Sequence, residues 1–350
     1  MVLRRDKVGM SEGSVPVSSR VFIIAEVGST HDGSFGNARA AIDVVADCGA
    51  DAVKFQTHIA EAETIRGAPT PSYFRGEPRY DYFRRTGFTR EQWKELKAYT
   101  EEKGLVFMSS PFSEAAVDLL QEIGMEVWKI PSGEVTNLPM LEKIARTGKP
   151  VLLSSGMSSW AEVDEAVETI VRHHRRLTVL QCTTEYPCPP EEVGLNVMVE
   201  MKERYGLPVG LSDHTLPNYA IFAAVALGAS AVEKHVTLSR RLYGSDARHS
   251  AEPEQFADLV RGIRDIEAML AAQVDKSDAK RFAEMKDVFQ KSVVAVVDIP
   301  KGAVIQGTML GIKKPGTGIP AKRFGDVVGK RSLRAIKADT VLTEADVPLG

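Results

Sequence analysis

The stretch PVGLSDHTLPNYAIFAAVALGASAVEKHV at residues 208–236 contains one complete strand–helix–strand unit. Its two outer segments, 208–213 and 231–236, are short and apolar on both faces, as buried parallel strands are. The segment between them, 218–227, has a helical pattern and is followed by Gly228, a typical helix C-terminal signal. Two strands joined by a helix are the repeating unit of α/β proteins, so this stretch predicts that fold class.

The same unit recurs along most of the chain. Strands are predicted at 21–28, 52–57, 105–110, 127–132, 151–156, 177–183, 208–213 and 231–236. Helices are predicted at 36–48, 90–103, 113–123, 138–147, 159–173, 193–204, 218–227 and 253–271. Eight such units in about 250 residues predict a (β/α)₈ TIM barrel. The alternative, an open doubly wound sheet, usually carries a glycine-rich phosphate loop that AEVGSTHDGS at 25–34 matches poorly.

The remaining segments complete the predicted domain organisation. Residues 1–19 are expected to be a flexible leader, 20–272 the barrel, 273–290 a charged helical linker arm, and 291–350 a small β-rich domain. Short strands between Gly and Pro turns indicate the last of these, which is marginal alone by size. The Pro-, Arg- and Tyr-rich segment 58–88 is long for a connection, and we predict that it forms a lid.

Composition excludes several classes of protein. The 350 residues are 43% hydrophobic and 26% charged, as in ordinary globular proteins. The net charge of -3 lacks the basic excess of a general nucleic-acid binder. No stretch approaches the roughly 20 apolar residues of a membrane span, and the leader lacks the apolar run of a signal peptide. Three irregularly spaced cysteines are expected to be reduced thiols, so we expect a cytoplasmic protein without membrane or nucleic-acid partners.

Polar side chains occur repeatedly at the carboxyl ends of the predicted strands, where barrel enzymes collect their reactive groups. Lys54 and Lys129 lie on buried strands, and a buried lysine needs an anionic partner. We therefore expect a ligand that bears phosphate or carboxylate groups. Hydroxyl groups from neighbouring strand ends can donate to the same oxygens. The polar strand-end set also contains Glu26, His31, Gln56, Ser109, Ser110, Ser132, Glu134, Ser154, Ser155, Thr183, Thr184, Tyr186, Ser212, Asp213, Glu233 and Lys234.

Two histidines, His214 and His235, end adjacent predicted strands, so their imidazoles can reach one point in space. Two nitrogen ligands with positions left for water or substrate suit Mn²⁺, Fe²⁺ or Zn²⁺, which would polarise a carbonyl as a Lewis acid. The alternative is a pair of structural histidines in polar networks. No nucleophile signature is evident, and the SSGMSS run at 154–159 is interpreted as an anion-binding turn.

Together these segments resemble the sialic acid (N-acetylneuraminate) synthase family, the phosphoenolpyruvate-dependent nonulosonic acid synthases. The resemblance runs from about residue 21 to the C-terminus, and the tail, with VVAVVDIPKG at 293–302 and KKPGTGI at 313–319, resembles the SAF (antifreeze-like) domain of that family. The landmarks in the barrel are IIAEVGSTHDG at 23–33, GADAVKFQ at 49–56, SSPF at 109–112, KIPSGEVTN at 129–137, SSGM at 154–157, QCTTEYP at 181–187, GLSDHT at 210–215 and GASAVEKHVTL at 228–238.

The resemblance implies a transferase that condenses phosphoenolpyruvate with an open-chain N-acetylmannosamine-like sugar and releases phosphate by C–O cleavage. It implies that His214 and His235 hold the metal, usually Mn²⁺, and that Glu26 and Glu134 are catalytic together with Lys54 and Lys129. Phosphoenolpyruvate contacts are implied for Lys54, Ser110, Lys129, Ser132, Ser154, Thr184, Tyr186 and Ser212. Sugar contacts are implied for Glu26, His31, Glu233 and Asp246, and for Lys314 of the partner subunit.

The resemblance also implies a homodimer in which the SAF domain of one subunit covers the barrel mouth of the other. The family's usual Asn-His-Asn-Gly is here Thr-His-Asp-Gly at 30–33, its Gly-Pro-Asp-His is Gly-Ser-Asp-Ala at 244–247 with the next histidine at His249, and its SAF arginine is Lys314. The 58–88 segment has no close counterpart. All four departures lie where the sugar would be recognised, so we expect retained chemistry and an altered acceptor.

Three alternatives remain open at this point. The chain could condense phosphoenolpyruvate with another sugar, as a 3-deoxyoctulosonate 8-phosphate synthase does, although the SAF-like tail counts against this. It could make a deaminated nonulosonate. It could also be a non-catalytic sugar-binding protein on the same fold, against which the retained Lys54, Lys129, Glu134, His214 and His235 argue.

Overall fold

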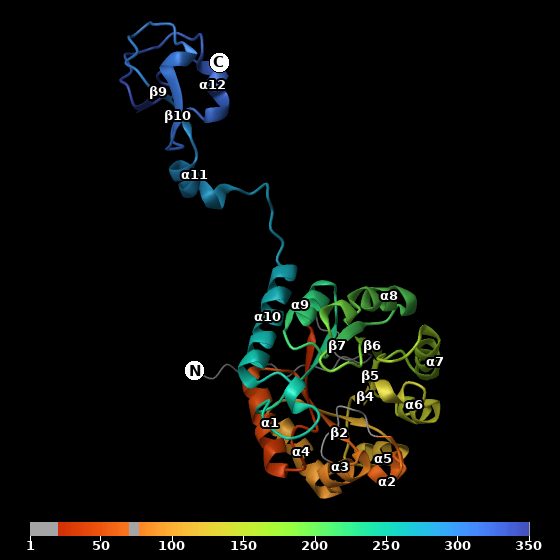
Figure 1. Ribbon diagram of the computed structural model, residues 1–350. Coiled ribbons are helices and arrows are strands. Elements are labelled where there is room, and N and C mark those ends of the chain that lie inside the picture. Colours follow the sequence, from red (N-terminus) through yellow and green to blue (C-terminus); the bar gives the residue numbers. More distant parts are fainter. Residues whose placement is uncertain (1–19, 70–76, 350) are drawn as a thin grey trace. The chain divides into compact units, whose positions relative to one another are not determined.

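The computed structural model describes residues 20–69 and 77–349 (Figure 1). The chain divides into two compact units, one ending at Ala272 and one beginning at Gln273. The predicted leader at 1–19 lies outside the described residues. Across the part that is described, no helix is both long enough and apolar enough to cross a membrane.

The first unit is an eight-stranded parallel barrel, which confirms the predicted fold and excludes the open doubly wound sheet. Its strands are hydrogen-bonded in the order β3-β2-β1-β8-β7-β6-β5-β4, so the first and last strands are neighbours. The two ends of this order, β3 and β4, contact each other and bring the barrel near to closure. The strands are β1 (Phe22–Gly28), β2 (Ala52–Thr57), β3 (Val106–Pro111), β4 (Trp128–Ile130), β5 (Val151–Ser154), β6 (Leu177–Cys182), β7 (Val209–Asp213) and β8 (Ala231–His235).

Eight helices follow the predicted positions around the barrel (Figure 1). The side chains of Thr89, Ser113 and Ser159 cap the N-termini of three of these helices. Ser159 takes this position because it forms a capping box with Glu162. The helices are α1 (Phe35–Cys48), α4 (Arg90–Glu102), α5 (Glu114–Glu122), α6 (Leu138–Ala145), α7 (Trp160–Val171), α8 (Leu195–Tyr205), α9 (Tyr219–Ala226) and α10 (Pro253–Ala271).

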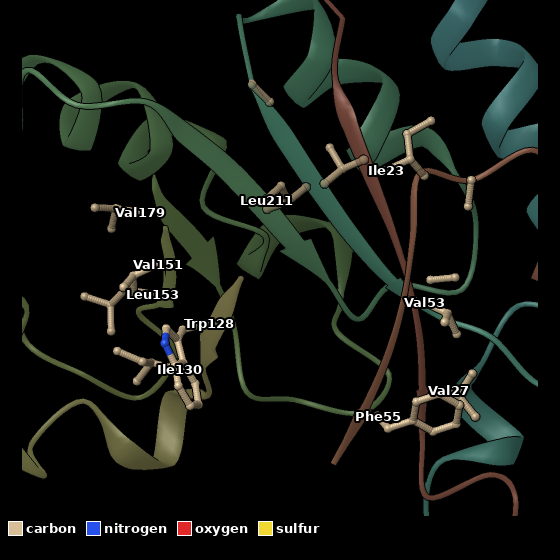
Figure 2. Close-up of a cluster of buried hydrophobic side chains, with 14 of the residues drawn as sticks. Ile23, Val27, Val53, Phe55, Trp128, Ile130, Val151, Leu153, Val179 and Leu211 are labelled. Atoms are coloured by element: carbon tan, nitrogen blue, oxygen red, sulfur yellow. The ribbon is translucent and has the colours of Figure 1, made fainter. Parts of the chain in front are cut away.

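Alternate strand residues face opposite sides of the barrel wall. One set packs outward against the helices, and Ile23, Val53, Phe55 and Trp128 are among the buried members of this core (Figure 2). The other set fills the barrel interior with apolar side chains: Phe22, Ile24, Ala52, Met108, Val127, Leu152, Leu180 and Ala231. The interior is therefore a packed layer rather than a pore, and it forms the floor on which polar side chains nearer the strand ends rest.

The segment predicted as a lid contains two short helices, α2 (Ala60–Glu63) and α3 (Arg79–Thr86). Ala60, Tyr80, Tyr82 and Phe83 form a small buried cluster between them. Residues 70–76 of the segment lie outside the described residues, and its action as a lid stays a prediction.

The second unit, Gln273–Gly350, contains a small antiparallel sheet with the strand order β10-β9-β11, and this confirms a β-rich C-terminal domain. The strands are β9 (Ser292–Ala295), β10 (Leu310–Lys313) and β11 (Thr340–Val341), and a short helix α12 (Phe324–Val327) lies between the last two. A separate core that includes Val293, Ile299, Ile305 and Leu342 supports the sheet. In the predicted helical arm, only α11 (Ala283–Phe289) and the 3₁₀ turn before it are helical.

Candidate active site

The register of the strands decides which polar side chains enter the barrel. Ala52 on β2 and Ala231 on β8 belong to the interior apolar layer, so two residues further along each strand Lys54 and Glu233 also point inward. The same period of two places the following residues on the interior side above the apolar floor: Glu26, Gln56, Ser110, Lys129, Ser154, Cys182, Ser212 and His235. Nearly all of the predicted site residues on strands therefore converge at the carboxyl-end mouth.

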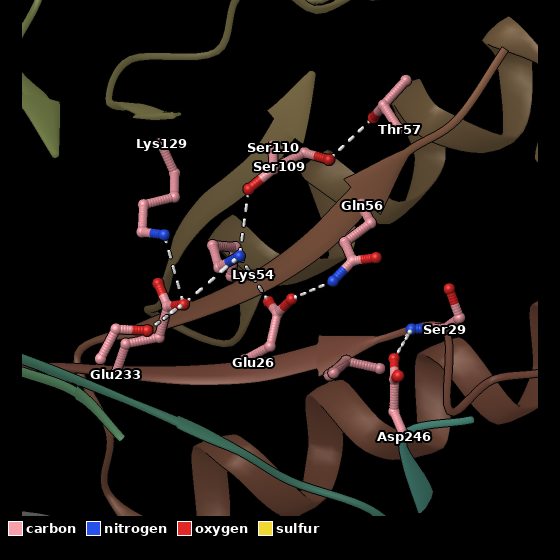
Figure 3. A network of polar contacts seen from close by, with 12 residues as sticks. Glu26, Ser29, Lys54, Gln56, Thr57, Ser109, Ser110, Lys129, Glu233 and Asp246 are labelled. Carbon is pink, nitrogen blue, oxygen red and sulfur yellow. Dashed lines mark hydrogen bonds and ion pairs between the residues drawn. The ribbon is translucent and has the colours of Figure 1, made fainter. Parts of the chain in front are cut away.

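A buried ionic network lies at the centre of this set (Figure 3). The Lys54 ammonium lies 2.9 Å from Glu26 Oε2 and 3.6 Å from Glu233 Oε1. The Lys129 ammonium lies 3.4 Å from the same Glu233 oxygen. All four side chains are at most 5% exposed, so solvent screens these charges little.

The network differs from the expectation that the buried lysines require an anionic ligand as their partner. The two strand lysines are paired inside the protein, because β1 and β8 each supply a carboxylate. Glu233, assigned by resemblance to the sugar, lies between both lysines and accepts a hydrogen bond from Ser212 Oγ at 3.2 Å. Lys129 forms one ion pair within the described chain, although an ammonium has three N–H donors. Lys129 can therefore still donate to an anionic ligand.

The two carboxyl groups of the network differ in their affinity for protons. Burial raises the pKa of Glu26 to about 7, against the opposing effect of Lys54. Burial would also raise the pKa of Glu233, but Lys129 and Lys54 outweigh it and lower this pKa to about 2. Glu26 can therefore gain or lose a proton near neutral pH, while Glu233 stays ionised. Glu26 is thus suited to proton transfer, and Glu233 is suited to balance the charge of the two lysines.

Hydroxyl groups and a backbone amide line the side of the mouth formed by β3 to β6. Lys54 Nζ donates to Ser110 Oγ at 3.1 Å, and the backbone N–H of Gly156 donates to Ser132 Oγ at the same distance. The Ser154 hydroxyl is buried with no hydrogen-bond partner among the described residues. An unpartnered buried donor is costly, so these groups favour an anionic ligand that accepts from them.

The groups of Ser132, Ser154 and Gly156 form a cradle for this anion, and the glycine allows a direct test of it. A Cβ at Gly156 would overlap the hydroxyls of Ser132 and Thr184, both assigned by resemblance to phosphoenolpyruvate. We expect Gly156→Ala to raise KM for phosphoenolpyruvate about tenfold, the loss of one to two hydrogen bonds. Gly36→Ala is the control, because its Cβ would meet only an ordinary contact at 3.8 Å. Steady-state kinetics that show equal KM values for both variants would contradict the cradle.

The two predicted metal ligands face each other across the mouth. Their ring centroids are 5.5 Å apart, and the Tyr186 ring lies 4.1 Å from that of His214. His214 Nδ1 lies 2.7 Å from the carbonyl oxygen of Thr183, so it donates and leaves Nε2 as the acceptor nitrogen. His235 Nδ1 is buried with no hydrogen-bond partner among the described residues.

Electrostatics keep both rings neutral, as metal ligands must be. Burial lowers the pKa of His214 to about 4, and burial also lowers the pKa of His235. The pair therefore fits a divalent metal through two imidazole nitrogens. Within residues 20–69 and 77–349, no group of three or more His, Cys, Asp or Glu side chains is arranged to hold a metal.

Glu134 lies in the 3₁₀ turn Ser132–Glu134 that follows β4. The side-chain Nδ2 of Asn137 donates to Glu134 Oε2 at 2.8 Å, and Asn137 Oδ1 caps α6 by accepting from the Met140 backbone N–H. Burial raises the pKa of Glu134, against the opposing Asn137 hydrogen bond. A half-buried carboxyl group with a raised pKa, oriented by a helix cap, is suited to accept a proton.

The other residues predicted to contact the sugar each have partners of a different kind. Asp246 Oδ2 accepts a hydrogen bond from the Ser29 amide at 3.0 Å. His31 is buried with its ring stacked on Phe88 at 4.6 Å, and burial lowers its pKa to about 4. Lys314 belongs to the second unit, where Nζ lies 4.9 Å from the centroid of the Phe289 ring. Its approach to the barrel of a partner stays a prediction.

One of the sequence departures has a partner in the structure. Asp32, which replaces the usual asparagine, pairs with Arg85 Nη2 at 2.8 Å, and Arg85 also pairs with Glu77 at 2.7 Å. Arg85 belongs to α3, so this ion pair joins the 58–88 segment to the loop after β1.

Sequence reasoning assigned no role to three polar residues near the site. Gln56 Nε2 donates to Glu26 Oε1 at 2.8 Å, and Gln56 in turn contacts His58, which pairs with Glu63. The inward register of β2 was the available signal for Gln56, because residues 52, 54 and 56 share one face. His58 and Glu63 had no such signal, since they follow the strand.

Comparison with known proteins identifies the chain's relatives. The sequence matches the NeuB family over residues 41–275 and the SAF domain over residues 290–348. It is 36% identical to the N,N'-diacetyllegionaminic acid synthase of Campylobacter jejuni, over 93% of this chain and 99% of that protein. It is 35% identical to the N-acetylneuraminate-9-phosphate synthase of Homo sapiens, over 92% and 91%.

Solved structures agree with the sequence comparison. The N-acetylneuraminic acid (sialic acid) synthetase of Leptospira borgpetersenii, solved in complex with citrate, superposes with a TM-score of 0.67 at 32% identity. The match covers 76% of this chain and 90% of that one. The chain therefore belongs to the NeuB family of sialic-acid-type synthases and carries the SAF domain of that family.

Proposed function

We propose that this enzyme condenses phosphoenolpyruvate with an open-chain N-acetylmannosamine-like sugar and releases phosphate by C–O cleavage. One observation carries the proposal: a buried network of two lysines and two carboxylates lies in the same mouth as a neutral histidine pair. The first group suits a small polyanion, and the second suits a metal beside a carbonyl. A condensation between an anionic enol phosphate and an aldehyde requires both.

The anionic substrate would lie between β2 and β6. Lys129 has donors to spare, and the hydroxyls of Ser110, Ser132 and Ser154 provide further ones. Charge-assisted hydrogen bonds of this kind are stronger than neutral ones. They would also fix the plane of the enol phosphate against the acceptor, which supplies much of the rate enhancement in a two-substrate reaction.

We propose Mn²⁺ as the metal, held by His214 and His235. When bound, it would polarise the carbonyl of the acceptor as a Lewis acid. Tyr186 packs on His214, and the Thr183 carbonyl fixes the tautomer of that ring, so the chain orients the ligand nitrogen before any metal arrives.

The reaction then requires two proton transfers, each near a side chain with a suitable affinity for protons. C3 of phosphoenolpyruvate attacks the aldehyde carbon, and the aldehyde oxygen takes up a proton as C2 becomes cationic. Glu26, with a pKa of about 7, is suited to exchange a proton at the acceptor. Water adds to C2, and Glu134, whose pKa is raised by burial, accepts its proton. Phosphate leaves with the bridging oxygen and takes up the proton of the C2 hydroxyl, and C2 becomes the ketone of the product.

The acceptor is proposed to differ from plain N-acetylmannosamine. The Asp32–Arg85 pair and the Ser29–Asp246 contact occupy loops where the sugar would be recognised. We further propose a homodimer in which Lys314 of the partner subunit completes this side. The cytoplasmic location expected from the sequence stays a prediction.

A product assay tests the proposal. Phosphate release from phosphoenolpyruvate labelled with ¹⁸O at the bridging oxygen is measured with Mn²⁺ and a panel of sugars. The panel contains hexoses, N-acetylated or not, phosphorylated or not, and a pentose phosphate. We expect release with at least one acetamido sugar, and we expect the label in the phosphate. Release with none of the acetamido sugars would exclude the proposal. Turnover of a pentose phosphate alone would favour the 3-deoxyoctulosonate-type alternative, and label left in the sugar acid would contradict C–O cleavage.

A further inference from the structure

His58 is a buried histidine that neither the metal pair nor the ionic network uses. It directly follows β2, and its ring is stacked between Phe83 of α3, with centroids 3.7 Å apart, and Phe112 after β3, with centroids 4.1 Å apart. Its side chain is 4% exposed. Because the two phenyl rings cover both faces of the imidazole, it can contact polar groups only along its edge, where both nitrogens lie.

Both nitrogens of that edge face acceptor groups. Nδ1 lies 3.0 Å from each carboxylate oxygen of Glu63 on α2, and Nε2 lies 3.1 Å from Gln56 Oε1. The orientation of the Gln56 amide is set by its other end, because Nε2 of Gln56 donates to Glu26 Oε1 at 2.8 Å. Nε2 of His58 must therefore carry a proton.

These bonds form a continuous chain into the site. It runs from Glu63 through His58 and Gln56 to Glu26, whose second oxygen is 2.9 Å from Lys54 Nζ. We propose that His58 is a positioning residue: anchored by Glu63, it fixes the Gln56 amide, and that amide fixes the rotation of the Glu26 carboxylate at the acceptor end of the site.

Packing alone does not account for a histidine here. A phenylalanine would fill the slot between Phe83 and Phe112 equally well, and it would avoid burying polar ring nitrogens, which is costly unless they are hydrogen-bonded. The nitrogens and their partners thus need a reason beyond the stack. Burial raises the pKa of Glu134, and the Glu63 carboxylate adds to this rise.

The consequence concerns the segment 58–88. Its helices α2 and α3 contribute Glu63 and Phe83, the two groups that hold His58 in place. A change in that segment would therefore reach Glu26 through three hydrogen bonds without touching the substrate. This rests on the proposed function insofar as Glu26 acts on the acceptor sugar.

The kinetic test uses a variant that keeps the packing and removes the chain of bonds. His58→Phe with Glu63→Met retains an aromatic ring between Phe83 and Phe112 and leaves no unpaired carboxylate. The matched control is His173→Phe with Glu142→Met, which removes another His–Glu pair (2.9 Å) remote from the mouth on α6 and the turn after α7.

We expect the first double variant to raise the KM of the acceptor sugar and lower kcat, each about tenfold, with KM for phosphoenolpyruvate changed less than twofold. The control should match the wild type. Equal constants in both double variants, or an equal rise in both KM values of the first, would overturn the positioning role.

A second measurement does not depend on activity. ¹⁵N NMR of the histidine ring nitrogens in the full-length chain should show His58 Nε2 protonated at neutral pH, and Nε2 without a proton would overturn the proposal. If the wild type turned over no acetamido sugar, the proposed function would fail, and this measurement would still judge the hydrogen-bond chain.

Discussion

Lys54→Met is expected to lower kcat/KM for phosphoenolpyruvate about 10²–10³-fold, because truncating one member of a buried charge pair costs about 2–5 kcal/mol. Two effects combine in this loss. The anionic substrate loses a buried cation beside its proposed site, and Glu26 and Glu233 lose the cation that lies 2.9 and 3.6 Å from them. The free energy of unfolding should also fall by about 3–5 kcal/mol. Urea denaturation and initial-rate kinetics measure the two effects separately.

A second variant separates ligand binding from charge balance. Lys54→Met combined with Glu26→Gln removes one charge of each sign from the network and should recover most of the lost stability. It should not recover activity, since neither the donor nor the proton-exchanging carboxyl group is restored. Recovery of kcat/KM in the double variant would mean that Lys54 serves only to neutralise Glu26, and the anion-binding role would be wrong.

Removing both imidazoles is expected to have the second large effect. His214→Ala with His235→Ala should abolish Mn²⁺ binding and lower kcat about 10³-fold, because a Lewis acid supplies several kcal/mol of transition-state stabilisation. Binding is followed by the electron paramagnetic resonance signal of free Mn²⁺. At 100 times its Kd, the metal should stabilise the wild type by about 2.7 kcal/mol and leave the variant unchanged.

His173→Ala provides the control for this experiment. His173 is a partly exposed histidine that pairs with Glu142 at 2.9 Å, and it should bind no catalytic metal. Treatment of the wild type with a chelator should reproduce the loss of activity of the double variant, and added Mn²⁺ should restore it. Full metal-dependent turnover in the variant without the two imidazoles would exclude the pair as the metal site.

The sequence predicted the barrel well because each signal for it is local. Short apolar runs, capping residues such as Thr89 and Ser113, and left-handed glycines such as Gly49 act over a few residues and mark the ends of elements. The alternation of inward and outward side chains is local too, and it brings Lys54, Lys129, Ser154 and Glu233 to one mouth. No long-range information was needed to place these groups together.

What could not be predicted depends on how side chains meet in three dimensions. A buried lysine requires a counter-charge, but the sequence does not say whether a ligand or Glu233 provides it, since this depends on the interior geometry. The His58–Glu63 pair and the Asp32–Arg85 pair depend on how the 58–88 segment folds back on the strands. That segment lacks strong periodicity, and so its contacts only emerge from the structure.

The hydrogen-bonded order of the barrel begins at β3 and ends at β4, and this has a mechanical consequence. Elsewhere around the wall, neighbouring strands are tied by backbone ladders whose strength is independent of side-chain identity. Across the barrel interior, β2 and β4 are also joined through β8, because the Glu233 carboxylate attracts both Lys54 and Lys129. This interior link is made of the same atoms that would receive the substrate, so ligand entry and the compliance of the wall are coupled.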